Sequence, residues 1–242
     1  NARLATANAY LKALDKVSDR ETKAFIIRQL QLLGKDECVD TLASYLNDES
    51  LSGPAARALS AIRTDNAKKV LVASLMRRSG TPKTQKNIIR AIADVQIADA
   101  ENVLKVMLSS SDENMQKEVL YALSRVGSKA SLAAAAEKAG YKMEKTGANE
   151  AYIALIKRVL EQGDTKDAEK AANDLLKKST KAGMTQTREA ALQILLAAKP
   201  EAATKNLLSA LKDTDKGYRN AALNFASGFA DQNVYIEVMK HM

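Results

Sequence analysis

One helix–turn–helix unit recurs along the whole sequence, and this repetition limits the possible folds more than any other feature. The clearest copy runs over residues 25–46, with an apolar helical stretch, a turn at 34–36 and a second apolar stretch. Leu30 and Leu33 are three residues apart, which places them on one face of a helix. Equivalent pairs recur every 29 to 39 residues, at Leu59 and Ile62, Ile92 and Val95, Leu123 and Val126, Ile156 and Val159, Leu195 and Ala198, and Ala226 and Phe229. Two helices repeated with a period in the thirties are the signature of an α-solenoid.

The composition favours helices throughout. Three prolines and ten glycines in 242 residues leave few helix breakers, and much of the 46% apolar content is alanine and leucine. No change of composition marks a domain boundary, so we predict a single repeat array over residues 1–242, preceded at 1–15 by a lone amphipathic helix. The chain begins with Asn1 rather than methionine, and we expect it to be a fragment of a larger protein.

The second helices have their own apolar column. Its members are Leu42, Leu71, Leu104, Leu207 and Val238, followed four residues later by Leu46, Leu75, Leu108, Leu211 and Met242. The last helix is therefore still apolar where the sequence stops, whereas natural arrays end in a unit with a polar outer face. We expect this C-terminal helix either to self-associate or to precede a further repeat.

The residues that usually carry chemistry are sparse. Cys38 is the only cysteine, and its equivalents in other repeats are mostly alanine, which predicts a packing role. His241 is the only histidine, and one histidine cannot build a His-based metal site or a catalytic triad. No Gly-rich phosphate loop is present, and no apolar run is long enough to cross a bilayer. We therefore predict no catalytic residues, no metal and no cofactor, and a protein that is not an enzyme.

Lysines on the second helices are the candidate binding residues. Lys69, Lys105, Lys205 and Lys240 are expected to project from the side that lines the inner face of a solenoid. Further basic clusters occur at Arg77, Arg78, Lys83, Lys86 and Arg90, and at Lys166, Lys170, Lys177, Lys178 and Lys181. The net charge is only +8, with 37 basic and 29 acidic residues, so three interpretations stay open. The lysines form solvated faces, meet an acidic protein partner, or contact nucleic acid phosphates.

Some segments resemble a known repeat family. The stretch from Pro54 to Ile62, PAARALSAI, is similar to the core of HEAT repeats, including those of the phycobilisome-lyase type. The segments 188–192 and 219–223, REAAL and RNAAL, resemble the start of the same repeat. The stretch from Thr22 to Gly34 also resembles HEAT segments attached to sugar-hydrolase-like domains in multidomain envelope proteins of Bacteroidetes. The resemblance implies a binding or spacer role without inherited active-site residues, and the last match implies a periplasmic or cell-envelope location.

The sequence thus predicts an all-α fold, a right-handed α-solenoid of about seven HEAT-like helical hairpins. The predicted function is a non-catalytic scaffold that presents a curved surface to a protein partner or to an adjacent domain of the same chain. One alternative is a nucleic-acid-binding protein of the HEAT-like DNA glycosylase type. A second alternative is an accessory module of a carbohydrate-active envelope protein.

Overall fold

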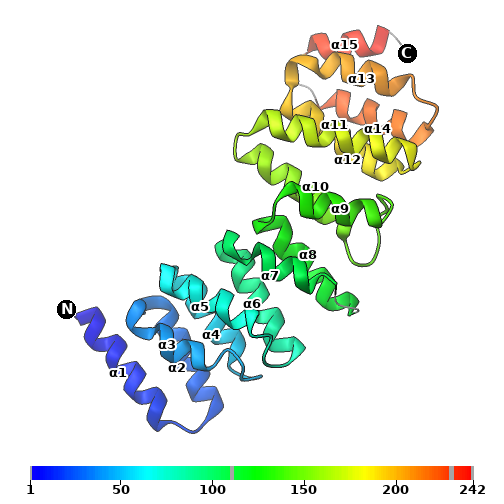
Figure 1. The fold of residues 1–242 in the computed structure, drawn as a ribbon. Helices are drawn as coiled ribbons and strands as arrows, with labels where there is room; N and C mark the ends of the chain where they lie inside the picture. Colours follow the sequence, from blue (N-terminus) through cyan, green and yellow to red (C-terminus); the bar gives the residue numbers. More distant parts are fainter. Residues whose placement is uncertain (1, 110–111, 229–231, 241–242) are drawn as a thin grey trace. The chain divides into compact units, whose positions relative to one another are not determined.

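The computed structural model describes residues 2–109, 112–228 and 232–240, and every regular element in these ranges is a helix (Figure 1). The helices fall into two compact units that divide between Gly127 and Ser128. After a first single helix, the described α-helices follow one another as seven successive pairs, which confirms the predicted all-α fold of HEAT-like hairpins. The continuity of one array across the division, and its right-handed sense, stay predictions.

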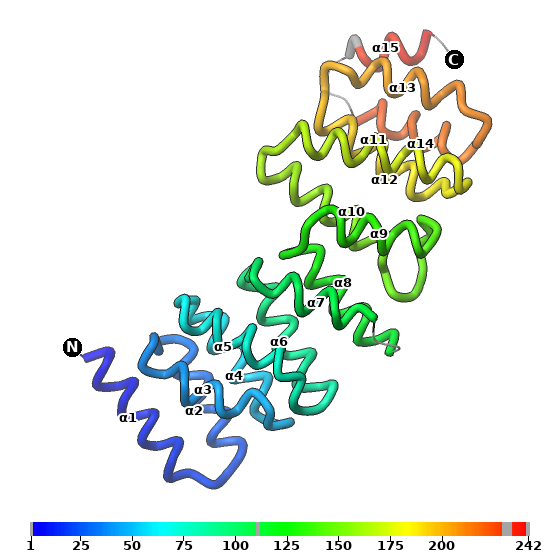
Figure 2. The backbone as a smooth tube through the Cα atoms, viewed as in Figure 1, coloured from blue at the N-terminus to red at the C-terminus, as the bar shows by residue number. Residues whose placement is uncertain are grey.

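Unit 1 is a stack of hairpins behind a single leading helix. Its elements are α1 (Ala2–Lys16), α2 (Arg20–Leu33), the 3-10 turn η1 (Asp36–Cys38), α3 (Val39–Ser44), α4 (Ser52–Ile62), α5 (Asp65–Met76), α6 (Pro82–Val95), the 3-10 turn η2 (Ala98–Ala100), α7 (Glu101–Met107) and α8 (Glu113–Val126). The first helices contact one another in series, α2 with α4, α4 with α6 and α6 with α8, and so form one layer (Figure 2). The leading helix α1 contacts α2 and η1, and buries Ala7 and Leu14.

Unit 2 has the same kind of helical pattern, with one longer connection at residues 139–147. Its elements are α9 (Lys129–Lys138), α10 (Ala148–Glu161), α11 (Thr165–Lys181), α12 (Thr185–Ala198), the 3-10 turn η3 (Pro200–Ala202), α13 (Ala203–Leu211), α14 (Lys216–Ser227) and α15 (Gln232–Lys240). The first helices α10, α12 and α14 again contact one another in series, and α13 contacts α15. Helix α10 also contacts both α9 and α11. These two second helices therefore pack against the same first helix.

Short polar residues start several of these helices, because a side-chain oxygen satisfies N–H groups that have no partner within the helix. Thr81 accepts a hydrogen bond from the N–H of Thr84 at the start of α6, and Pro82 occupies the first helical position, as the sequence indicates. Asp164 accepts from the N–H of Asp167 at the start of α11. These caps fix helix starts both between hairpins, at Thr81, and within a hairpin, at Asp164.

A column of aliphatic side chains forms the core of the first-helix layer. Its members are all at most 3% exposed: Leu30, Leu59, Ile92, Leu123, Ile156 and Leu195. Burying one such side chain contributes about 1.5 to 3 kcal/mol. The predicted partner column is less buried, since Leu33, Ile62, Val95, Val159 and Ala198 are only half-buried while Val126 is buried. Each residue of an α-helix is rotated by about 100° around the axis from the one before it. A residue three positions later therefore lies about 60° away, toward the edge of the buried face.

A buried polar link holds the long connection between α9 and α10 in unit 2. The amide of Asn149 donates to the hydroxyl of Thr187 at 2.7 Å, and that hydroxyl donates to the carbonyl oxygen of Tyr141 at 2.6 Å. Thr187 lies on α12, so the connection is fixed to the next first helix of the unit. Polar groups removed from water require partners of this kind.

Some predictions fall outside the part of the chain that the structure describes. Phe229, His241 and Met242 lie outside it, and the expectations placed on them stay predictions. In the described ranges, none of the helices combines the length and the apolar character that crossing a membrane requires.

Candidate functional site

The four predicted lysines all lie exposed on second helices. Lys69 is on α5 and Lys105 is on α7 in unit 1, while Lys205 is on α13 and Lys240 is on α15 in unit 2. The Nζ of Lys105 pairs with Glu101 at 2.8 Å, and the Nζ of Lys240 pairs with a glutamate one helical turn away at 3.5 Å. Two of the lysines lie in each unit, and a row that contains all four stays a prediction.

Lys69 borders a groove on the second-helix side of unit 1. The groove has a volume of about 420 Å³ and lies along α5, where Val72, Ala73 and Met76 line it, and it ends at the turn that precedes α7. Met76 is largely exposed there. Second helices in unit 1 therefore leave an apolar depression beside a lysine.

A larger groove lies at the corresponding place in unit 2, between α9 and α11. Its volume is about 550 Å³, and its lining residues are Lys129, Ala130, Ala133, Tyr152, Lys170, Ala171, Asn173, Asp174 and Lys177. Alanines from both helices form the walls, and Tyr152 of α10 lies at the bottom with only 4% of its surface exposed. Small side chains on facing helices leave this space unfilled.

Ion pairs link α9 to α11 at both ends of the groove. The ammonium of Lys129, at the start of α9, pairs with Asp167 near the start of α11. Lys178, near the end of α11, lies 3.9 Å from Glu137 at the end of α9 and 3.1 Å from Asp174. Exposed pairs of this kind add little stability, and here they span the space between the two helices at both ends of the groove. The groove is therefore open along its length and bounded at its ends.

Four lysines follow one face of α11 beside the groove, and we call this set the α11 lysine stripe: Lys166, Lys170, Lys177 and Lys181. Spacings of four, seven and four residues keep the side chains within about 60° around the helix axis and spread them over about 22 Å. All four side chains are exposed, and within the described part of the chain none of them forms an ion pair. Two members of the stripe, Lys170 and Lys177, also line the groove.

The protonation states of the groove follow from its surroundings. The hydrogen bond with Asp174 raises the pKa of Lys178, which keeps this ammonium charged. Burial raises the pKa of Tyr152, so the bottom of the groove presents a neutral phenol. The site therefore combines an uncharged floor with a rim of three lysines and the carboxylate of Asp174, which is paired with Lys178.

Cys38 has the environment of a packing residue. The side chain is fully buried beside Gly34, where an added Cβ would lie 3.0 Å from the cysteine sulfur. Burial raises the pKa of the thiol, which disfavours the reactive thiolate. Among the described residues, no group of three or more His, Cys, Asp or Glu side chains is arranged to hold a metal ion.

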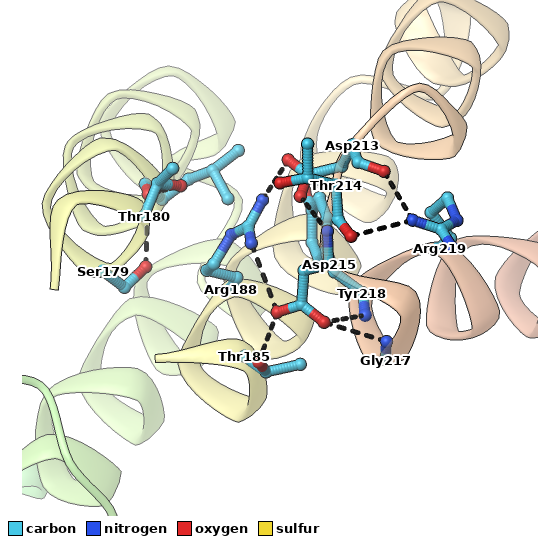
Figure 3. A network of polar contacts seen from close by, with 11 residues as sticks. Ser179, Thr180, Thr185, Arg188, Asp213, Thr214, Asp215, Gly217, Tyr218 and Arg219 are labelled. Atoms are coloured by element: carbon cyan, nitrogen blue, oxygen red, sulfur yellow. Dashed lines mark hydrogen bonds and ion pairs between the residues drawn. The ribbon is translucent and has the colours of Figure 1, made fainter. Parts of the chain in front are cut away.

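A polar network of unit 2 surrounds Arg188 (Figure 3). The guanidinium on α12 pairs with Asp213 and, at 3.4 Å, with Asp215, both in the loop before α14. It also lies over the ring of Tyr218, 4.0 Å from the ring centre, in a cation–π contact. Asp215 accepts in addition from the hydroxyl of Thr185 and from the N–H groups of the first turn of α14. One buried arginine therefore joins two successive hairpins.

The pKa values in this network agree with a charged, paired arrangement. Burial is the largest single influence on Asp213 and would raise its pKa, but the hydrogen bonds from Arg188 and from the N–H of Asp215, together with the charge of Arg188, outweigh burial and lower the pKa. The hydrogen bond from Thr185 lowers the pKa of Asp215. Burial raises the pKa of Tyr218 to about 12 despite the nearby guanidinium, so the ring remains neutral under the cation. This network stabilises the fold and does not face the groove.

Comparison with known proteins supports the repeat assignment. A family model described as HEAT repeats matches residues 72–155, about a third of the chain. The crystal structure of an engineered protein, a Northeast Structural Genomics Consortium target, aligns over 98% of this chain and 97% of its own, with 21% identity and a TM-score of 0.36. A search of curated proteins gave no match.

The groove itself was not predicted from the sequence. The lysine cluster at 166–181 was recognised, and its four-seven-four spacing would have placed four of its members on one face of a helix. The groove depends on the distance between α9 and α11. The small side chains at 130, 133 and 171 leave room for it, but the sequence alone does not show that the two helices face each other.

Proposed function

We propose that this chain is a non-catalytic HEAT-like scaffold that binds a protein partner through its second helices, with the groove between α9 and α11 as the main contact. The observation that carries the proposal is this groove, which combines a buried and uncharged floor, ends spanned by ion pairs, and two exposed lysines, Lys170 and Lys177, that form no ion pair in the described part of the chain. Partner sites in proteins share this combination of a desolvated centre and a polar rim. Solenoid repeats generally serve as extended binding surfaces rather than as catalysts.

The other candidate roles are supported by fewer observations. A role in an envelope-associated, carbohydrate-active protein is supported only by the resemblance of residues 22–34. Self-association through α15 is supported by the exposed side chains of Tyr235, Ile236 and Met239. Continuity of one array over both units is supported by the family match, which spans residues on both sides of the division.

Photo-crosslinking at two matched alanines tests the proposal. Benzoylphenylalanine replaces Ala130, which lines the groove, or Ala154, an exposed residue of α10 on the opposite side from Tyr152. In an extract of the organism that encodes the protein, we expect discrete protein adducts from position 130 that persist after nuclease treatment. Position 154 should give few adducts. Equal adduct patterns at the two positions would contradict binding through the groove, and adducts lost on nuclease treatment would favour the nucleic acid alternative.

A further inference from the structure

The α11 lysine stripe and the groove together define what kind of partner segment fits. Resting on the function proposed above, we infer that this surface binds an extended acidic segment of a protein, with acidic side chains on the lysines and one apolar side chain in the groove. The stripe supplies four exposed ammonium groups without ion-pair partners in the described part of the chain. The groove supplies the alanine walls at 130, 133 and 171.

The spacing of the lysines matches an extended chain. Along the helix axis, Lys166 and Lys170 are about 6 Å apart, as are Lys177 and Lys181, and the gap between the two pairs is about 10 Å. In an extended peptide, side chains on one face repeat about every 6.7 Å, so two acidic residues that flank a central residue of the same face are about 13 Å apart, a difference from the gap between the lysine pairs that the flexible stems of the lysines can close. Two acidic side chains can therefore meet each lysine pair, and the residues between them pass the groove.

The groove itself favours protein over nucleic acid. Binding of single-stranded nucleic acid without sequence preference relies on exposed aromatic faces for base stacking. Among the described residues, Tyr152 is the only aromatic residue that lines the groove, and its side chain is 4% exposed and offers no such face. The alanine walls suit an aliphatic side chain instead. The free lysines balance carboxylates, whose charge is complementary.

A binding assay with a defined probe tests the inference. The probe is a short fluorescent peptide with glutamates at alternate positions around a central leucine, titrated with the full chain and followed by fluorescence anisotropy. We expect the variant K170E/K177E to bind the probe at least about tenfold more weakly than the unmodified protein, because reversing charge at an interface replaces attraction by repulsion. Replacing the central leucine of the probe by serine should also weaken binding.

The matched control reverses two other lysines of unit 2 that lie outside the second helices. Lys157 on α10 and Lys212 after α13 are both exposed, so K157E/K212E changes the net charge of the chain as much as K170E/K177E does. Binding by this control should stay within about threefold of the unmodified protein, since a distant charge acts only through screened long-range attraction. Circular dichroism of all variants checks that they are folded.

Three outcomes would overturn the inference. Equal losses in the two double variants would show general charge attraction without a site. Tighter binding of a single-stranded DNA oligomer than of the peptide, lost in K170E/K177E, would assign the stripe to nucleic acid. Absence of peptide binding would contradict an acidic segment as the ligand. Protein adducts at position 130 would in that case still support a protein partner of other chemistry, so the two proposals can fail separately.

Discussion

Replacing Arg188 by alanine is expected to lower the free energy of unfolding by about 3 to 5 kcal/mol, the largest effect of any polar substitution considered. The side chain of Arg188 is 6% exposed and balances Asp213 and Asp215 at once. Removing it leaves two carboxylates near a buried site without their counter-charge, and also removes the cation–π contact with Tyr218. Urea denaturation followed by far-ultraviolet circular dichroism measures the change.

An exposed residue of the same unit supplies the control. Lys216 begins α14 close to the network, and K216A should change the free energy of unfolding by no more than about 0.5 kcal/mol. If R188A cost no more than K216A, the network would contribute nothing to the stability of the fold. A double-mutant cycle of R188A with D213N isolates the coupling between the two side chains.

The same network predicts the sign of a pH dependence. The pKa values of Asp213 and Asp215 are lowered in the folded protein, so the stability they provide is complete above their unfolded pKa, near 3.8. It is lost as the pH falls through their lower, folded values. The difference in unfolding free energy between the unmodified protein and R188A should therefore be constant from pH 5 to 7 and narrow below about pH 4. A difference that widened in acid would contradict the assigned pairing.

Two leucines of one helix provide the second large prediction. Leu30 is fully buried in α2, whereas Leu32, two residues later, is 80% exposed. L30A should lower the free energy of unfolding by about 2 to 5 kcal/mol, because it removes core contacts and leaves a cavity. L32A removes the same atoms from a solvated position and should cost no more than about 0.5 kcal/mol.

This comparison tests the register of the repeat itself. Composition and helix propensity change identically in the two variants, so only the position on the helix face differs. Similar losses of stability in thermal or urea denaturation would mean that the two leucines are equally buried. A larger loss in L32A would place the core on the other face of α2.

The core was predictable from the sequence because burial follows the local period of a helix. Leu30 and its equivalents stand in one column, and each of those described is buried. Cys38 was assigned to packing from its column alone, and its side chain is fully buried. The burial of such positions follows from apolar residues spaced three or four apart, and this spacing can be read from the sequence alone.

The interactions between repeats were not predictable in the same way. Arg188 and Asp213 are 25 residues apart, and their pairing depends on where the loop before α14 lies against α12. The groove of unit 2 depends on how closely α9 and α11 approach, which the sizes of many side chains decide together. The division between Gly127 and Ser128 likewise has no counterpart in composition.

Nuclear magnetic resonance of alanine methyl groups tests the binding surface most directly. With alanine methyls labelled and the acidic probe peptide added, the account predicts shifts concentrated at Ala130, Ala133 and Ala171, which line the groove. The methyl group of Ala154, exposed on the far side of α10, should stay unchanged. Shifts concentrated on the first helices, or spread evenly over both units, would contradict a partner site between α9 and α11.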